Sequence, residues 1–165
     1  MSDYRGMTLQ VAANDNENKG YFEAARAHQL VIKACEDCGK LRWEPGPTCP
    51  WCLSMKWRWQ PVSGKGTIYS YQIVHHAIQP GFKEWAPYPI VLVELDEQRG
   101  EPTPDEALRM VMNLVDADFN AEREENVAIG KRVEIVFNDI DADFSLPQWR
   151  LSTEQPTGLV WQFPH

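Results

Sequence analysis

The sequence predicts a mainly β protein built from a short N-terminal helix, a small metal-binding ribbon and a five-stranded barrel. Three observations support this fold class. All four cysteines stand in two CxxC pairs. Alternating or β-branched runs recur after the cysteines, and 12 prolines and 10 glycines favour many turns over a helix bundle. We therefore assign residues 1–29 to a leader and helix, 30–62 to the ribbon and 63–165 to the barrel with a C-terminal tail.

The first segment carries little sign of regular structure before one short helix. Residues 1–16 are polar and aperiodic, and we expect them to fray. Asn18 can cap a helix over residues 19–28. Tyr21 and Ala25 lie near one face of that helix, so we expect it to dock on the body of the protein.

The four cysteines form the most specific motif in the chain. A tight turn between the two cysteines of a CxxC pair points both sulfurs at one metal, and two such pairs complete a tetrahedral S4 site. We therefore predict a structural Zn²⁺ site formed by Cys35, Cys38, Cys49 and Cys52. Iron accepts the same four ligands and is the alternative metal. Disulfides are disfavoured because the sequence begins without a signal segment, and a redox CxxC does not need a second pair.

Three short strands are expected around the cysteines, at residues 30–34, 41–43 and 56–60. Gly39, directly after the first pair, permits a backbone conformation that such a turn often requires. Together these features form a zinc ribbon. A unit of about 30 residues buries too little apolar surface to fold alone, so we expect the metal to supply much of its folding free energy.

Five further strands are expected after the ribbon. They are residues 67–77, 89–95, 108–115, 132–137 and 146–151. Polar residues 97–105 are expected at the tip of a hairpin, and charged residues 116–126 in a loop with one helical turn before the fourth strand. Five strands with a helical segment in this place fit a Greek-key barrel of the OB type. Residues 158–163 either add an edge strand or dock as a tail.

The charge distribution disfavours nucleic acid as the ligand. The net charge is −8, yet residues 30–66 carry six basic and three acidic residues, whereas residues 94–143 carry five basic and fifteen acidic residues. Nucleic-acid binding depends on neutralising phosphates, for which an acidic barrel is poorly suited. No apolar run approaches the roughly 18 residues of a membrane-spanning helix, and we expect a cytoplasmic protein.

A series of motifs then follows in order along the chain. CxxCG and CPxC precede SGKGTIYSYQIVHH, PYPIVLVEL, NLVD, IGKRVEIVF and LPQWRL. Over residues 20–151 this series resembles the domain-of-unknown-function-thirty-five family, in which a rubredoxin-like zinc ribbon precedes an OB-fold barrel. The chain departs from the common pattern in its single short N-terminal helix, its EPTPDE segment and its tail beyond residue 151.

The resemblance implies an acyl-CoA-associated protein. Members of this family are accessory subunits that bind CoA thioesters or bridge two enzymes in lipid, sterol and polyketide pathways. We accordingly expect acyl-CoA as a ligand and a thiolase-like or hydratase-type enzyme as a partner, and a homo-oligomer is compatible with the sequence. The nucleic-acid-binding interpretation of the OB-fold rests on fold analogy alone.

The junction between ribbon and barrel is the candidate CoA-binding segment. Its glycines expose backbone N–H groups, its lysines add positive charge, and an arginine can stack on an adenine ring. The candidate residues are Lys56, Arg58, Ser63, Gly64, Lys65 and Gly66. The alternative is a plain bend in which the glycines permit close backbone approach.

Two groups of aromatic residues add further hypotheses. Phe82, Trp85 and Tyr88 belong to a loop, where they would cap an acyl chain, insert into a partner enzyme or pack back on the barrel mouth. Trp57 and Trp59 are expected to seal the seam between ribbon and barrel.

No catalytic constellation is evident in the sequence. Cysteines that bind a metal are unavailable as nucleophiles, and no serine has an evident base and orienter. His75 and His76 are adjacent in a strand, so they face opposite sides. We therefore predict a non-catalytic accessory protein. The alternatives are a single-stranded nucleic-acid-binding OB module, a stand-alone acyl-CoA enzyme, and electron transfer by an iron-loaded ribbon.

Overall fold

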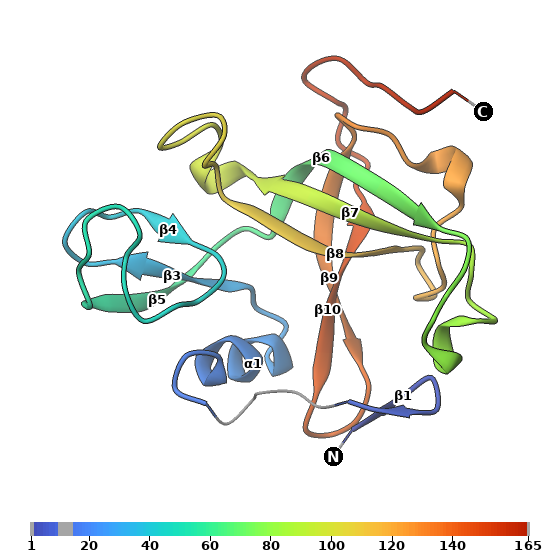
Figure 1. Cartoon of the computed structure of the whole chain (residues 1–165), viewed down its shortest axis with the longest axis horizontal. Helices are drawn as coiled ribbons and strands as arrows, with labels where there is room; N and C mark the ends of the chain where they lie inside the picture. Colours follow the sequence, from blue (N-terminus) through green and yellow to red (C-terminus); the bar gives the residue numbers. More distant parts are fainter. Residues whose placement is uncertain (1, 10–14, 165) are drawn as a thin grey trace.

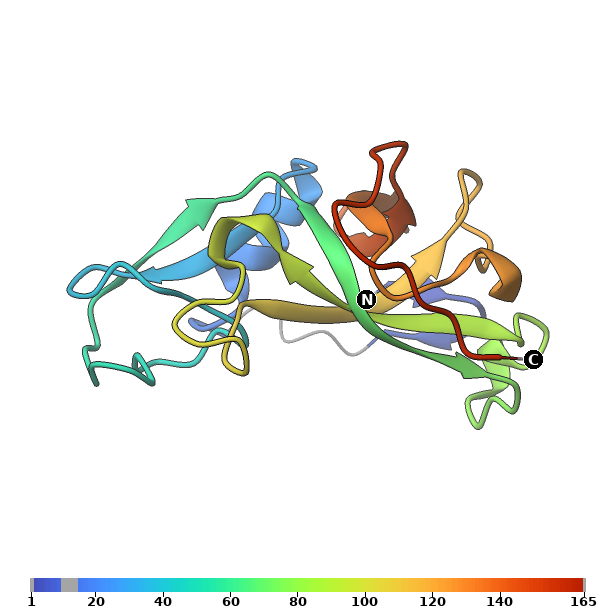
Figure 2. The same cartoon turned by 90° about the horizontal axis from the view of Figure 1, so that it is seen from above.

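A three-stranded ribbon sheet and a closed five-stranded barrel make up the computed structural model, which describes residues 2–9 and 15–164. The ribbon lies at one end of the molecule and the barrel at the other, and the helix α1 (Lys19–Arg26) lies beside both (Figure 1). The view from above shows the same elongated arrangement (Figure 2). The predicted fold class, mainly β with one helix, a ribbon and a barrel, is confirmed.

The ribbon is an antiparallel sheet with β3 (Val31–Cys35) in the centre. It pairs with β4 (Leu41–Arg42) on one side and β5 (Trp57–Pro61) on the other. All five residues of β3 are buried. Burial on both faces explains why Val-Ile-Lys-Ala-Cys is a nearly continuous apolar run and not an alternating one.

The barrel has the strand order β10-β8-β7-β6-β9. Its strands are β6 (Lys65–Val74), β7 (Tyr88–Leu95), β8 (Arg109–Val115), β9 (Arg132–Asp139) and β10 (Ser145–Leu151). Neighbouring strands pair antiparallel except β10 and β8, whose short parallel pairing closes the barrel. Each strand begins and ends within three residues of its predicted limits. Closure leaves no free sheet edge, which is why a small barrel of this kind is stable.

One hydrophobic core runs through the ribbon, the helix and the barrel. Alternate residues of β7 point inwards, and its buried positions include Val91 and Val93. Ile32 of the ribbon and Tyr21 of α1 belong to the same cluster of buried side chains, as does the fully buried Trp149 of β10. The ribbon therefore shares its core with the barrel, a source of stability in addition to the metal that was expected to supply much of its folding free energy.

The leader contains a hairpin, so the prediction that it frays is wrong for residues 2–9. β1 (Asp3–Tyr4) and β2 (Met7–Thr8) pair antiparallel across a turn in which Arg5 and Gly6 both have positive φ, +55° and +71°. Two central residues of this kind give the tight turn that matches strand twist. Residues 10–14 lie outside the described residues.

The hairpin is held by the loop that follows β6. The ring of Tyr4 lies 6.1 Å from that of Phe82, and the guanidinium of Arg5 lies 4.1 Å from the ring centroid of Trp85. A Cβ added to Gly81 would lie 2.3 Å from the Arg5 carbonyl oxygen, so glycine permits this close approach. These contacts join residues about 75 positions apart, and the polar composition of the leader does not reveal them.

The helix α1 begins as predicted but is capped differently. Asn18 makes no side-chain capping hydrogen bond. Instead the carboxylate of Asp15 accepts the backbone N–H groups of Glu17 and Asn18, at 3.0 and 2.7 Å, and the Asn18 amide also donates to it. The helix ends at Arg26, and His28 has a left-handed φ of +55°, which a continuing helix does not allow. The helix docks on β3, β9 and β10 as expected.

The connecting segments follow the predictions in outline. Residues after β7 form the short 3₁₀ helix η2 (Asp96–Gln98), and the predicted helical turn before β9 is η3 (Glu124–Asn126). A third 3₁₀ helix, η1 (Pro80–Phe82), opens the aromatic loop. The C-terminal segment docks as a tail that makes a single bridge with Ile129 through Trp161. Within the described residues, no helix has the length and apolar character needed to cross a membrane.

Candidate metal centre and ligand-binding residues

The two CxxC pairs form matching turns. Gly39 N–H donates to the carbonyl of Cys35 at 3.0 Å in the first turn. Leu53 N–H donates to the carbonyl of Cys49 at 3.0 Å in the second. Gly39 and Leu53 both have left-handed φ values, +74° and +62°. The sequence indicated this conformation at Gly39, but Leu53 was missed because leucine rarely adopts it.

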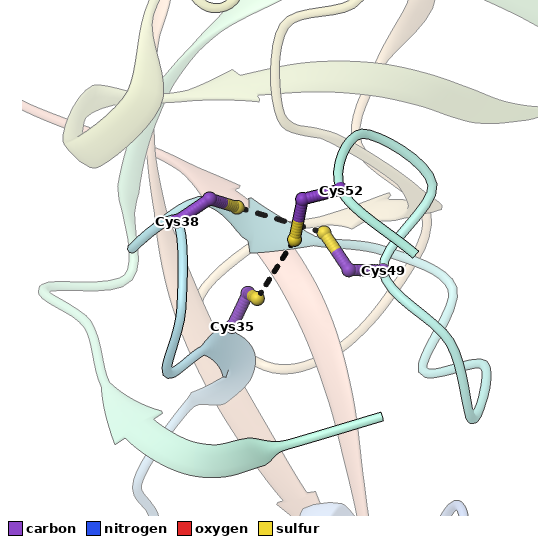
Figure 3. A group of neighbouring side chains, drawn as sticks. All are labelled: Cys35, Cys38, Cys49 and Cys52. Carbon is purple, nitrogen blue, oxygen red and sulfur yellow. Dashed lines mark hydrogen bonds between the residues drawn. The ribbon is translucent and has the colours of Figure 1, made fainter. Parts of the chain in front are cut away.

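The four cysteine sulfurs converge on one point between the two turns (Figure 3). The Sγ atoms of Cys35 and Cys52 are 3.5 Å apart, those of Cys38 and Cys49 are 3.6 Å apart, and all four lie within 4.8 Å of one another. A tetrahedral site with Zn–S bonds of about 2.3 Å has S–S edges of about 3.8 Å. The donor set and spacing therefore fit a closed tetrathiolate Zn²⁺ site, as predicted. Across the described ranges, these four residues are the one group of His, Cys, Asp and Glu with this metal-ligand geometry.

Backbone N–H groups lower the pKa of two of the cysteine thiols. The N–H of Cys38 in particular, with that of Asp37, lowers the pKa of Cys35 to about 6 although burial opposes the shift. Burial also raises the pKa of Cys49, but the N–H groups of Cys52 and Trp51 outweigh it, so this pKa is lowered. At the first cysteine of each pair, the lowered pKa favours the thiolate, which is the form that binds a metal.

The thiol of Cys52 must lose its proton when a metal binds. The Ser54 N–H lowers the pKa of Cys52, but burial and the neighbouring thiols raise it to about 12. Ligation by Zn²⁺ requires the thiolate, so metal binding releases this proton. Cys52 is the one exposed member of the group, whereas Cys35 and Cys49 are buried.

Two buried cations hold the loop that carries the second cysteine pair. Lys33, with no exposed surface, donates to the carbonyl of Pro45 at 3.2 Å and pairs with Glu17. Arg42 donates to the carbonyl of Gly46 at 3.1 Å. In the sequence, the charge of these two residues gives no indication of their structural role. The one signal for burial was the position of Lys33 inside an apolar strand.

The seam between ribbon and barrel is bridged by Gln98. Its side chain accepts the N–H of Leu41 at 2.7 Å and donates to the carbonyl of Leu41 at 2.8 Å, so η2 continues the hydrogen bonding of β4. Trp59, predicted at this seam, packs on α1, where a Cβ on Gly20 would lie 2.1 Å from its Nε1. Trp57 lies beside Lys33, whose ammonium is 3.7 Å from its ring centroid.

The backbone groups of the candidate CoA turn already have protein partners. Ser63 N–H donates to the Glu97 carboxylate at 2.5 Å, and Lys65 N–H donates to the Ser63 hydroxyl at 3.1 Å. The Lys65 ammonium pairs with Glu154, and this contact raises the lysine's pKa. A phosphate at this turn would have to compete with two carboxylates.

The two glycines of the turn are required by close packing. A Cβ on Gly64 would lie 2.2 Å from the Ile135 side chain, and one on Gly66 would lie 2.4 Å from Val93. Gly64 also has a φ of +71°. The packing accounts for both glycines without a ligand, and a role of Ser63–Gly66 in CoA binding stays a prediction.

The two basic side chains before the junction are exposed. Lys56 lies 3.7 Å from the Asp37 carboxylate, and Arg58 donates to the Gln60 side chain at 2.9 Å. Both are free to reorient because neither is held in a buried network. Their contribution to CoA binding also stays a prediction.

The aromatic loop is packed within the protein. Trp85 stacks on Tyr88 with ring centroids 5.0 Å apart and also contacts Phe82, at 5.5 Å. Trp85 is buried, and the hairpin at residues 3–8 covers the cluster. Of the three interpretations of this loop, the structure supports packing against the protein itself.

A serine, an aspartate and a histidine do meet at the end of β9, but not in catalytic order. Ser145 donates to Asp139 Oδ1 at 2.5 Å, and His28 Nε2 lies 2.8 Å from the same oxygen. Activation of a serine requires the histidine between the other two residues. Here the aspartate is central, so this group ties the end of α1 to the barrel.

Two family models match adjoining parts of the chain. Residues 22–58 match the family model described as "ChsH2, rubredoxin-like zinc ribbon domain". Residues 59–138 match "ChsH2, C-terminal OB-fold domain". The two matches adjoin and cover most of the chain. The chain belongs to the ChsH2 (DUF35) family.

Relatives of this DUF35 protein include chains that it matches over most of their length and longer chains that it matches in part. It is 33% identical over 115 residues to a "DUF35 domain-containing scaffold protein" of Methanocaldococcus jannaschii, covering 69% of this chain and 71% of that one. It is 35% identical over 143 residues to a "Probable enoyl-CoA hydratase alpha subunit" of Thermomonospora curvata, covering 87% of this chain. The matched region spans 40% of the length of that hydratase subunit.

Solved structures show the same fold. A chain of the "Ltp2-ChsH2(DUF35) aldolase" is 35% identical, with a TM-score of 0.68, and the match covers 86% of this DUF35 protein and 98% of that chain. A DUF35 protein of Sulfolobus solfataricus shares the fold at 13% identity, with a TM-score of 0.54.

Proposed function

We propose that this DUF35 protein is an accessory subunit that docks to an acyl-CoA enzyme and contributes no catalytic residue. The supporting observation is the 35% identical chain in the Ltp2-ChsH2(DUF35) aldolase, which this protein matches over 98% of its length. A match of that extent includes both the ribbon and the barrel, which supports a similar role for the two parts together. A thiolase-like or hydratase-type enzyme is the proposed partner.

The ribbon would act as a structural part of this subunit. Its four thiolates form a closed ligand set for Zn²⁺, with no position left for a substrate. When bound, the ion would cross-link the two arms of the ribbon and hold them in one shape. Reduced cysteines that serve as metal ligands suit the reducing cytoplasm, where we place the protein.

The proposed ligand is a CoA thioester, held with the partner enzyme. The basic ribbon side chains Lys56 and Arg58 are exposed and available to the CoA phosphates. Lys65 would join them by exchanging its partner Glu154 for a phosphate, with Ser63, Gly64 and Gly66 forming the turn beneath it. The affinity of exposed arginine and lysine side chains for phosphate decreases steeply as the salt concentration rises.

Co-expression with acyl-CoA enzymes encoded beside the gene tests docking. We expect one such enzyme to co-purify with the DUF35 protein, and its acyl-CoA turnover to rise when the two are combined. Turnover by the DUF35 protein alone would contradict the accessory role. Failure of every neighbouring acyl-CoA enzyme to bind would contradict the docking proposal.

Calorimetric titration with CoA and acetyl-CoA tests ligand binding in the resulting complex. We expect the Lys56→Ala/Lys65→Ala variant to bind CoA at least about tenfold more weakly, since each lost phosphate contact is a charge-assisted hydrogen bond. Lys19→Ala/Lys83→Ala removes two exposed lysines elsewhere and should leave binding unchanged. Equal affinity of the two double variants would contradict the assignment of this site.

A further inference from the structure

The C-terminal tail is firmly held through its backbone. The N–H and carbonyl of Trp161 both pair with Ile129, at 3.0 and 2.8 Å. Phe163 N–H donates to the hydroxyl of Tyr71 at 2.8 Å. The Gln162 amide donates to the carbonyls of Glu124, Glu125 and Val127, at 3.3, 3.1 and 3.0 Å. The tail therefore runs back over the barrel in one defined path (Figure 2).

The barrel is shaped to receive this tail. A Cβ on Gly130 would lie 2.1 Å from the Leu159 carbonyl oxygen, and Gly130 has a φ of +89°. Only glycine satisfies both the backbone angle and the space. The docking of the tail thus depends on a specific residue in the body of the barrel.

The apolar side chains of the same tail are exposed. Leu159 is 85% exposed, Trp161 42% and Phe163 51%, and Val160 is also exposed. The rings of Trp161 and Phe163 meet edge to face at 4.6 Å, and Phe163 meets Tyr71 at 5.1 Å. Large aromatic side chains on a fixed backbone lose little conformational freedom on binding and are enriched among the residues that dominate interfaces.

Acidic residues lie beside these exposed aromatics. Gln162 reaches the backbone of Glu124 and Glu125, and Glu122 follows β8 in the same loop. Arg123 pairs with Glu125 and is the one base in this short run. A second copy of this chain, with a net charge of −8, would bring the same acidic rim against this one. Like charges facing each other across an interface disfavour that pairing.

We infer that Leu159, Val160, Trp161 and Phe163, with Tyr71, form an apolar anchor that inserts into a socket on the acyl-CoA enzyme. The rim of that socket carries lysine or arginine side chains opposite the acidic run at residues 122–125. This inference rests on the proposed docking function and names the surface that performs it.

The test uses the acyl-CoA enzyme that co-purifies with the wild-type chain, identified by mass spectrometry and then purified. Its affinity is measured for the full chain with Trp161→Ala/Phe163→Ala. We expect at least about 100-fold weaker binding, because truncation of two central aromatic anchors typically has an effect of this size. Met55→Ser/Val111→Ser, which changes two exposed apolar residues elsewhere, should bind like the wild type.

A second variant separates the anchor from a loss of folding. Gln162→Leu keeps the aromatic side chains but removes the three hydrogen bonds that the Gln162 side chain contributes to holding the tail. We expect binding to weaken by about tenfold through lost pre-organisation. Glu122→Gln/Glu125→Gln should slow association at low salt and reduce its salt dependence. Circular dichroism of all variants should match the wild type, because these side chains contribute little to the core.

The outcomes distinguish the inference from the function on which it rests. If the wild type retains no acyl-CoA enzyme, the proposed function fails. If the wild type binds its enzyme and Trp161→Ala/Phe163→Ala binds it equally well, only the anchor is wrong. The anchor is also overturned if Trp161→Ala/Phe163→Ala and Met55→Ser/Val111→Ser weaken binding equally. It is overturned too if the wild type is a dimer that Trp161→Ala/Phe163→Ala dissociates.

Discussion

Two residues with left-handed backbone follow the two CxxC pairs, and only one of them is a glycine. Gly39 takes φ +74° without steric cost, whereas Leu53 takes φ +62° with a Cβ that crowds the backbone. The Leu53 side chain is 76% exposed, so packing offers little compensation. The metal-binding turn imposes this conformation, because the N–H of Leu53 must reach the carbonyl of Cys49.

Replacing these two residues should therefore have opposite effects. Leu53→Gly removes the strain of a left-handed non-glycine backbone, which is about 1–2 kcal/mol. It also costs about 0.5–1 kcal/mol, because glycine has more conformational freedom in the unfolded chain. We expect a gain of up to about 1 kcal/mol in the free energy of unfolding, and Gly39→Ala should lose about 1 kcal/mol. Urea unfolding of the zinc-loaded protein measures both. A destabilised Leu53→Gly would refute the argument from backbone strain.

At the scale of elements, side chains rather than continuous sheets join the parts of the molecule. Gln98 of η2 satisfies both backbone groups of Leu41 at the edge of the ribbon. At the other side of the ribbon, α1 is tied to the end of β9 by His28, which bonds Asp139 and stacks on Phe137. Each of these two contacts is centred on one side chain, so each can be tested by one substitution.

Gln98→Leu should weaken the joint between ribbon and barrel. The replacement is similar in size but leaves the buried N–H and carbonyl of Leu41 without partners, which should cost about 2–4 kcal/mol of unfolding free energy. Gln155→Leu changes an exposed glutamine and should stay within about 0.5 kcal/mol of the wild type. Chemical denaturation compares them, and equal stability of the two variants would show that the bridge contributes nothing.

The joint at Asp139 should respond to pH. The Ser145 hydroxyl, and then His28, hold the pKa of Asp139 below its usual value of 3.8. A lowered carboxyl pKa adds stability above the unfolded value, and this stability is lost as pH falls through the folded value. Asp139→Asn should therefore have a lower urea midpoint than the wild type at pH 7, and the gap should narrow below pH 4. A difference in urea midpoint between the two proteins that stays constant from pH 7 to pH 3 would exclude a contribution of Asp139 ionisation to stability.

At the scale of the whole molecule, one core and one metal site stabilise two unlike parts. Ile32 and Leu41 of the ribbon lie in the same cluster as Leu95 and Leu108 of the barrel region. The cysteine turns lie at the far end of the ribbon, away from this core (Figure 1). The metal therefore organises the tip, while β3 also depends on the shared core.

Removal of the metal should loosen the ribbon first. With a strong chelator, we expect fast hydrogen exchange at residues 35–56, partial loss of protection in β3 and retained protection in the barrel strands. Four of the seven tryptophans, at positions 43, 51, 57 and 59, lie in the ribbon, so tryptophan fluorescence should change as well. Zn²⁺ should restore both signals, and Cys35→Ser should reproduce the chelated state. Unchanged exchange after chelation would exclude a structural role for the metal.

The features that depend on local spacing were predictable from the amino-acid sequence. Alternating or β-branched runs located the barrel strands, because such runs suit strands that are buried on one face or both. The CxxC spacing identified all four metal ligands, because a turn of that length brings both sulfurs to one side. The ordered motifs indicated the family before any geometry was known.

The features that depend on distant contacts became apparent in the folded structure. Gln98 meets a residue 57 positions away, and Tyr4 is buried against a loop near residue 82. Lys33 is buried because carbonyls and Glu17 converge on it, although its residue type favours the surface. Local patterns carry no signal for such contacts, since each depends on two segments that meet only after the chain has folded. For the same reason the sequence shows that the tail contains apolar residues, but not that its backbone is bonded to the barrel while its aromatic side chains are exposed.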